Sequence, residues 1–322
     1  MKKIIYTLLS VCLVSLFACQ KDPYPYITLK EAKKIDSLVH PGIKNVAFIY
    51  GNNVYYVADF TKPVVQITKD GSASGQVKLS HDHTKFAYLS GPNNIKIVDN
   101  KGGIITTLSQ YSDVKTFDWS ADDKTLWILN GDDIAFYGPN MKLPGISYES
   151  FNKYSDQEIL SASVSVNGDL AYIVKAFDFF TGTQYELIIE RADNGPAIEY
   201  RPGNFNGKPD YVSFSAHNQD MVLGYVDINT GHPGGAQENL ELFTDLDAYP
   251  TGHYGAVSSA TPVYNSKLNY VVAAGQNENG DNVPAALYLG TGDTTVFTGA
   301  NVAQTLFLDK FGFFGVLYID WK

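Results

Sequence analysis

Short runs of alternating apolar and polar residues follow one another along most of this chain, separated by polar turns. One turn recurs: an apolar run, a serine, a few residues rich in Asp, Asn and Gly, and a second apolar run. The four serines are Ser80, Ser120, Ser165 and Ser215. Strict alternation indicates half-buried strands. A repeat of roughly 40–50 residues with several strands per unit is typical of a β-propeller.

The repeat predicts an all-β fold with six blades. From Asn45 onward the strands and turns divide into six units, and the first unit lacks a convincing first strand. Residues 303–321 contain strand-like runs but too few for a whole blade. We therefore expect strands within Leu306–Tyr318 to complete the N-terminal blade, which would close the ring and remove its open edge. Seven blades remain possible if the two ends form separate blades.

The recurring turn resembles the Ser-Pro-Asp-Gly repeat of TolB-type and WD40-like (PD40) propellers. Asp82 and Asp122 keep the acidic position, whereas no copy keeps the proline, and Asn167 and His217 replace the aspartate in the later copies. The resemblance covers most of residues 45–321 and implies the fold without implying an activity, because such repeats occur in enzymes, transport accessories and scaffolds. We expect the repeated Ser and Asp side chains to bind backbone groups of the turn.

The first residues are typical of an export signal. A basic start is followed by the apolar run Ile4–Phe17, which is too short to span a bilayer. The run ends in Leu16–Cys19, which resembles the lipobox of bacterial lipoproteins. The resemblance implies cleavage after residue 18 and lipidation of Cys19, with a further acyl chain such as palmitate on the new amine, so that the membrane is a partner. The alternative is an ordinary secretory signal with an incidental cysteine.

The residues after the signal suggest a location and a domain plan. Gln20 stands where, in the sorting scheme of Gram-negative lipoproteins, Asp would retain the protein at the inner membrane. The resemblance therefore implies a lipid-anchored outer-membrane protein, facing either the periplasm or the cell surface. We divide the chain into a signal peptide (1–18), a lipidated tether with a short amphipathic helix at 29–39 (19–43), and a propeller domain (44–322).

Charge and cysteine content narrow the possible functions. The formal net charge is −10, from 24 basic and 34 acidic residues, and no Lys/Arg cluster could follow a phosphate backbone. Nucleic-acid binding is therefore not expected. Both cysteines, Cys12 and Cys19, lie at the signal, so the body would contain no disulfide.

Motifs that carry chemistry are missing from the sequence. It contains no G-x-S-x-G, H-E-x-x-H or phosphate-loop pattern, and we expect no cofactor. His81 and His83 have a spacing that can bind a metal, but they lie in the recurring turn. We interpret them, and His217 in the matching turn, as exposed turn residues and expect no metal site.

Aromatic residues in two predicted loops are the candidate ligand-binding residues. The first loop contains Phe177, Phe179 and Phe180, and the second contains Tyr249, His253 and Tyr254. Exposed rings can stack on sugars or aromatic ligands. The alternative is that both loops fold over the ring and bury these side chains.

The leading hypothesis is a non-catalytic lipoprotein of the cell envelope that binds a ligand or protein partner through one propeller face. Nutrient uptake would fit, with a glycan, peptide or metal chelate as ligand and an outer-membrane transporter as partner. One alternative is a hydrolase or lyase acting on polysaccharide, with carboxylates in the central channel. It predicts ionisable side chains with shifted pKa values at the channel mouth. Another alternative is a periplasmic assembly scaffold similar to TolB.

Overall fold

The computed structural model describes residues 44–58, 64–144, 155–178, 182–200, 207–227, 237–246, 250, 252–255, 263–267, 270–276, 282–288, 304–305 and 318–322. The predicted signal, Cys19 and the predicted helix lie outside these ranges. So do Phe179, Phe180 and Tyr249. Within the described ranges every regular element is a strand, and they contain no helix long and apolar enough to cross a membrane.

The strands form six antiparallel sheets, numbered here in chain order. Sheet 1 contains β1 (Val46–Tyr50), β2 (Asn53–Val57), β3 (Val65–Gln66) and β23 (Ile319–Trp321), and sheet 2 contains β4 (Gly75–Leu79), β5 (Lys85–Leu89), β6 (Ile95–Asp99) and β7 (Ile104–Leu108). Sheet 3 contains β8 (Val114–Trp119), β9 (Leu126–Asn130) and β10 (Asp133–Tyr137), and sheet 4 contains β11 (Ser155–Val164), β12 (Leu170–Asp178), β13 (Gly182–Glu190) and β14 (Ile198–Tyr200). Sheet 5 contains β15 (Gly207–Phe214), β16 (Met221–Asp227), β17 (Gln237–Phe243) and β18 (Gly252–Gly255), and sheet 6 contains β19 (Val263–Asn265), β20 (Tyr270–Gln276), β21 (Asn282–Tyr288) and β22 (Gln304–Thr305).

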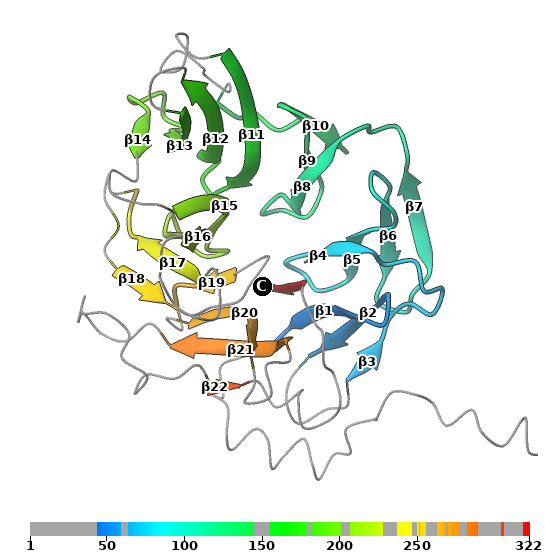
Figure 1. Cartoon of the computed structure of the whole chain (residues 1–322). Coiled ribbons are helices and arrows are strands. Elements are labelled where there is room, and N and C mark those ends of the chain that lie inside the picture. The colour runs from blue at the N-terminus through cyan, green and yellow to red at the C-terminus, as the bar shows by residue number, and fades with distance from the viewer. Residues whose placement is uncertain are drawn as a thin grey trace, which may run out of the picture.

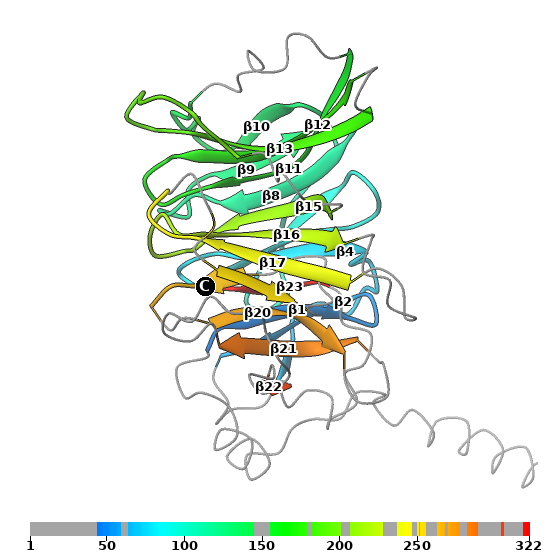
Figure 2. The same ribbon diagram turned by 60° about the vertical axis from the view of Figure 1, so that its left-hand side comes forward.

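The sheets are arranged as the blades of a β-propeller (Figure 1). One edge strand of each sheet contacts the corresponding strand of the next sheet, in the order β23, β4, β8, β11, β15, β19 and back to β23. These six inner strands form a closed circle. Figure 2 shows the same ring turned about the vertical axis, so that the sheets are seen from the side. The predicted fold is therefore confirmed.

Ring closure joins the two ends of the chain. β23 pairs with β1 in antiparallel register, with Val46 opposite Trp321, and the Ile49 amide donates to the Tyr318 carbonyl at 3.1 Å. The C-terminus consequently lies near the centre of the ring (Figure 1). The described closing strand, β23, begins one residue after the predicted range Leu306–Tyr318, of which residues 306–317 lie outside the described ranges, and residues 304–305 belong to sheet 6. Ile319 and Trp321 are almost fully buried, so this closing strand is also part of the core.

Apolar side chains fill the spaces between neighbouring sheets. Between sheets 4 and 5, for example, Ile173 and Leu187 form one cluster with Phe214 and Phe243. Since strand side chains alternate between two faces, each sheet supplies one face to each neighbour. Removing one such buried aromatic side chain typically costs about 3–5 kcal/mol.

The recurring turns are stabilised in the predicted way. In sheet 2, the Ser80 hydroxyl donates to Asp82 at 2.7 Å and accepts the Lys85 amide at 2.9 Å. In sheet 3, Ser120 makes the same pair of bonds, to Asp122 at 2.7 Å and from the Thr125 amide at 3.0 Å. We call these segments serine turns; each joins an inner strand to the second strand of its sheet.

Candidate binding site at the mouth of the central channel

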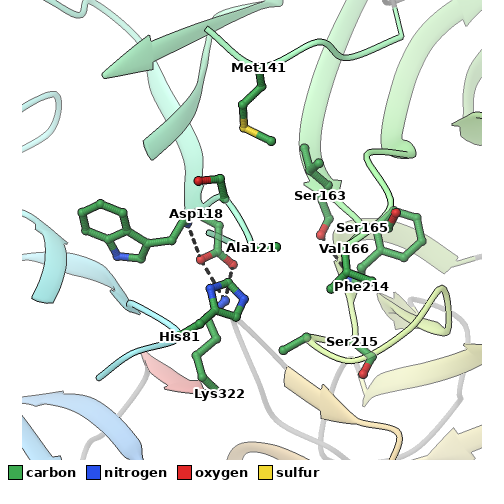
Figure 3. Close-up of a pocket in the computed structure, with 14 residues that line it drawn as sticks. His81, Asp118, Ala121, Met141, Ser163, Ser165, Val166, Phe214, Ser215 and Lys322 are labelled. Carbon is green, nitrogen blue, oxygen red and sulfur yellow. Dashed lines mark hydrogen bonds and ion pairs between the residues drawn. The ribbon is translucent and has the colours of Figure 1, made fainter. Parts of the chain in front are cut away.

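The residues that directly follow the inner strands meet at one end of the ring. Ser120, Ser165, Ser215 and Lys322 directly follow β8, β11, β15 and β23, His81 is the second residue after β4, and all five line a single depression (Figure 3). Residues far apart in the sequence meet here because the circle of inner strands places the ends of these strands around one axis. This depression, the channel mouth, is the candidate site.

A network of four charged side chains lies at the floor of the mouth, and two of them, Asp118 and Lys322, line it. The Lys322 ammonium lies 2.9 Å from both carboxylate oxygens of Asp118. The Lys78 ammonium lies 3.6 Å from Asp118 Oδ2 and 3.4 Å from Asp320 Oδ1. Three sheets thus contribute to one network, which we call the axial network. Its two cations balance its two anions.

The axial network also crosses the channel. Lys78, on the inner strand of sheet 2, donates to the Tyr211 hydroxyl of sheet 5 at 3.3 Å, and these sheets lie on opposite sides of the ring. Asp320 accepts the Leu79 amide at 2.8 Å. The Lys78–Tyr211 contact therefore bridges the ring between two opposite sheets.

Asp118 and Lys322 remain ionised at neutral pH. Burial by itself would raise the pKa of Asp118, but Lys322 and Lys78 outweigh it and hold the pKa at about 2. Burial by itself would lower the pKa of Lys322, but Asp118 and Asp320 outweigh it and raise this pKa above the ordinary value. Asp118 is therefore a fixed negative charge near pH 7 and a poor proton acceptor.

Two histidines of the serine turns lie close to the mouth. The His81 ring Nδ1 is 2.9 Å from an Asp123 carboxylate oxygen, and its side chain is only 23% exposed. His217 Nε2 lies 3.0 Å from the Asn265 amide nitrogen. Burial lowers the pKa of His217, and the nearby charges of Lys267 and of His81 lower it further. Both histidines are thus partly buried and hydrogen-bonded, in contrast to the exposed side chains expected from the sequence.

The described residues contain no group of three or more potential metal-binding side chains. Sequence reasoning missed His81, Asp118 and Lys322 as site residues. The serine register could have identified His81, because the serine marks the end of each inner strand and His81 is the next residue after Ser80. Nothing in the sequence near Lys322 shows that its side chain reaches sheet 3.

The aromatic candidates that the structure describes, Phe177, His253 and Tyr254, are not among the residues that line the mouth. Phe177 is 45% exposed near the end of β12. Since β12 begins directly after a serine turn, Phe177 is at the opposite end of its blade. His253 and Tyr254 belong to β18, the outermost strand of sheet 5, with His253 opposite Glu241. Phe177 and the channel mouth therefore lie in separate regions.

Comparisons with known proteins find similarity among solved structures and none among family models or curated proteins. No protein-family model matches the chain, and no curated protein matches it. Similar solved structures include TolB from Acinetobacter baumannii, with a TM-score of 0.47, 14% identity, and coverage of 81% of this chain and 65% of TolB. A chain of the mitotic checkpoint complex has a TM-score of 0.46 and 13% identity over 79% of this chain and 75% of its own length. Kuenenia stuttgartiensis hydrazine synthase has a TM-score of 0.46 and 10% identity over 77% of each chain. The present chain thus spans about two thirds of the TolB chain.

Proposed function

We propose that this protein is a non-catalytic, lipid-anchored binding protein of the cell envelope, and that it binds a ligand or partner at the channel mouth. The observation that carries the proposal is the depression at the ends of five inner strands. Its floor is fixed by the axial network, and its walls come from different sheets. A concave site with a few fixed polar groups is the usual form of a binding site.

Binding is favoured over acid–base chemistry by the state of the acidic side chains. A glycosidase-type reaction needs one carboxyl group able to give up or accept a proton near neutral pH. Asp118 is held in an ion pair with a pKa of about 2. Asp123 accepts hydrogen bonds from the backbone amides of His81 and Asp82. Both carboxylates are already used to hold the structure together.

Site-specific crosslinking tests the binding proposal. Ala121 lines the mouth and is exposed, so a photoreactive amino acid there would face a bound partner. Ile105 on β7 is 50% exposed at the outer edge of sheet 2 and is the matched control. We expect capture of an envelope component, identified by mass spectrometry, from position 121 alone. Equal capture at both positions, or capture at neither, would contradict the proposal.

The captured component would also separate the possible roles. An outer-membrane transporter would support nutrient uptake, with a peptide, glycan or metal chelate as cargo. A component of an envelope assembly machine would support a scaffold role of the kind that the turn resemblance suggests. Capture of a polysaccharide, together with release of a shortened product, would instead support the hydrolase or lyase alternative.

The lipid anchor rests on the Leu16–Cys19 segment and on Gln20. We expect the wild-type protein to incorporate labelled palmitate and to fractionate with the outer membrane. The Cys19→Ser variant should lose the label and leave the membrane fraction, because it would carry none of the acyl chains that stable anchoring needs. Retention of the label in that variant would contradict lipidation at Cys19.

A further inference from the structure

Sheet 4 extends beyond sheet 3 at the end of the ring opposite the mouth. Its strands β11, β12 and β13 contain ten, nine and nine residues, whereas β8, β9 and β10 contain six, five and five. Because β8 and β11 both end directly before the serine of their turn, the four additional residues of β11 all lie at the opposite end. They add roughly 13 Å of strand. We call this extension, residues 155–158, 175–178 and 182–185, the ledge.

One face of the ledge has two aromatic rings beside an ion pair. The strand register places three side chains in one row across β11, β12 and β13, namely Glu158, Lys175 and Tyr185. In the row beyond it, Phe177 is opposite Thr183. Since strand side chains alternate between two faces, Phe177 and Lys175 share the face that packs against sheet 5 further along β12. The pKa of Tyr185 is raised by partial burial, and the charges of Lys175 and Glu158 also act on it, so the two rings and the ion pair form one surface.

This surface is open to solvent. Phe177 is 45% exposed and is the only aromatic ring among the exposed large apolar side chains of the described residues. Thr183 is exposed as well, and Lys175 and Glu158 are partly exposed. A single exposed apolar side chain needs no special explanation. The distinguishing feature of Phe177 is the set of polar groups that the register places next to it.

The polar groups of the ledge are held in place and can still bond to a ligand. The Lys175 ammonium lies 3.2 Å from one oxygen of Glu158, and the Lys115 ammonium lies 3.4 Å from the other. Hydrogen bonding from Lys175 and the charge of Lys115 lower the pKa of Glu158, which therefore stays ionised near pH 7. An ammonium group has three N–H donors and a carboxylate about four acceptor positions, so both groups of the Lys175–Glu158 pair keep capacity for hydroxyl groups.

We propose that the ledge binds an oligosaccharide, with a sugar ring stacked on Phe177 and its hydroxyl groups bonded to Lys175 and Glu158. A sugar ring has an apolar C–H face that suits an aromatic ring and an edge of hydroxyl groups that suits a donor beside an acceptor. Tyr185 provides both a ring and a hydroxyl in the same row. The ledge is separate from the channel mouth, so this inference goes beyond the proposed function and names a second site.

The charges around the ledge favour a neutral sugar over an acidic one. Lys115 lies within 3.8 Å of three carboxylates, those of Asp113, Asp132 and Glu158. Together with Lys175, this group contains two cations and three anions. The whole chain is also acidic, with a formal net charge of −10. A polyanionic glycan would therefore be repelled, whereas a neutral one would not.

Isothermal titration calorimetry with defined sugars tests the inference. The probes are cellohexaose, maltohexaose and mannohexaose, with hexagalacturonate as the acidic comparison. We expect at least one neutral probe to bind with a Kd below about 1 mM, and hexagalacturonate to bind at least about tenfold more weakly. Phe177→Ala should weaken binding of the neutral probe by about tenfold, because the ring that stacks on the sugar is lost. Val65→Ala is the matched control, since Val65 on β3 is 47% exposed, and it should leave the Kd within about twofold.

A second pair of variants tests the polar half of the site. Lys175→Met should weaken binding of the neutral probe by about tenfold, whereas Lys175→Arg, which keeps a charged donor, should stay within about threefold. Binding of none of the three neutral probes, binding of hexagalacturonate alone, or an unchanged Kd in Phe177→Ala would overturn the inference. Capture at position 121 reports separately on the channel mouth. Capture there without sugar binding would overturn the inference and leave the proposed function intact, and sugar binding without capture would do the reverse.

Discussion

Buried ionisable side chains behave in opposite ways in the axial network and in the interface between sheets 4 and 5. On the axis, Lys78 and Asp320 are almost fully buried and lie 3.4 Å apart, and Tyr211, Asp118 and Asp320 raise the pKa of Lys78 above its ordinary value despite its burial. In the interface, Glu241 on β17 is only 1% exposed, close to Tyr200. Burial raises the pKa of Glu241 to about 7, and a hydrogen bond from Tyr200 offsets this only in part. Burial alone therefore does not decide the charge of a side chain; the partner does.

The largest expected effect comes from breaking the axial network. Lys78→Met removes the cation that contacts Asp118, Asp320 and Tyr211, and it leaves Asp320 buried with one fewer partner. We expect a loss of about 3–5 kcal/mol in the free energy of unfolding, as is typical when one member of a buried ion pair is removed. Urea denaturation at pH 7 measures it.

The control for that variant is a surface pair of the same chemistry. Lys124 is 72% exposed and lies 3.2 Å from Asp122, so Lys124→Met should change the free energy of unfolding by less than about 1 kcal/mol. Similar losses in both variants would show that the axial network has no special role in stability.

The second effect is a pH dependence that originates at Glu241. Its folded pKa of about 7 lies above the ordinary value of 4.5, so the folded state holds this proton more tightly than the unfolded state. Stability from this group is complete below about pH 4.5 and is lost as the pH rises to about 7, a change on the order of 3 kcal/mol. Asp118, with its pKa of about 2, contributes nothing to this window.

Glu241→Gln isolates that contribution, because glutamine keeps an acceptor for Tyr200 and cannot ionise. The variant should gain stability relative to the wild type steadily between pH 5 and pH 8, as measured by urea denaturation at each pH. Parallel stability profiles for the two proteins would mean that Glu241 does not titrate in this range.

A third, smaller effect is expected where a buried carboxylate accepts hydrogen bonds from backbone amides of a neighbouring turn. Asp123→Gly keeps the left-handed backbone of this position but removes the carboxylate that holds the turn of sheet 2. We expect a loss of about 1–3 kcal/mol, the usual cost of hydrogen bonds to a charged group. Amide hydrogen exchange at residues 81 and 82 should accelerate, while exchange in β12 stays unchanged. Unchanged exchange at residues 81 and 82 would contradict the role of Asp123.

The sequence predicted what depends on local pattern. The serine register, the strand alternation and the shortage of strands at the N-terminal end were sufficient for a ring closed by its two ends. The axial network was beyond this reasoning because its members come from three separate blades. Lys78, Asp118 and Lys322 each look like an ordinary polar position in an alternating strand or at its end. Only the circular arrangement shows that these positions share one axis. The burial of Glu241 could not be predicted from the sequence for the same reason.

The smallest expected effect lies at the end of the ring opposite the mouth. Phe177 is 45% exposed, so Phe177→Ala should alter the free energy of unfolding by no more than about 0.5 kcal/mol. Phe243, which is fully buried between sheets 4 and 5, is the matched control, and its replacement by alanine should cost about 3–5 kcal/mol. Because Phe177 and the mouth are at opposite ends of the blades, crosslinking from position 121 should be unchanged in Phe177→Ala. Loss of the crosslink in that variant, with stability retained, would move the binding site to the aromatic loop and away from the axial network.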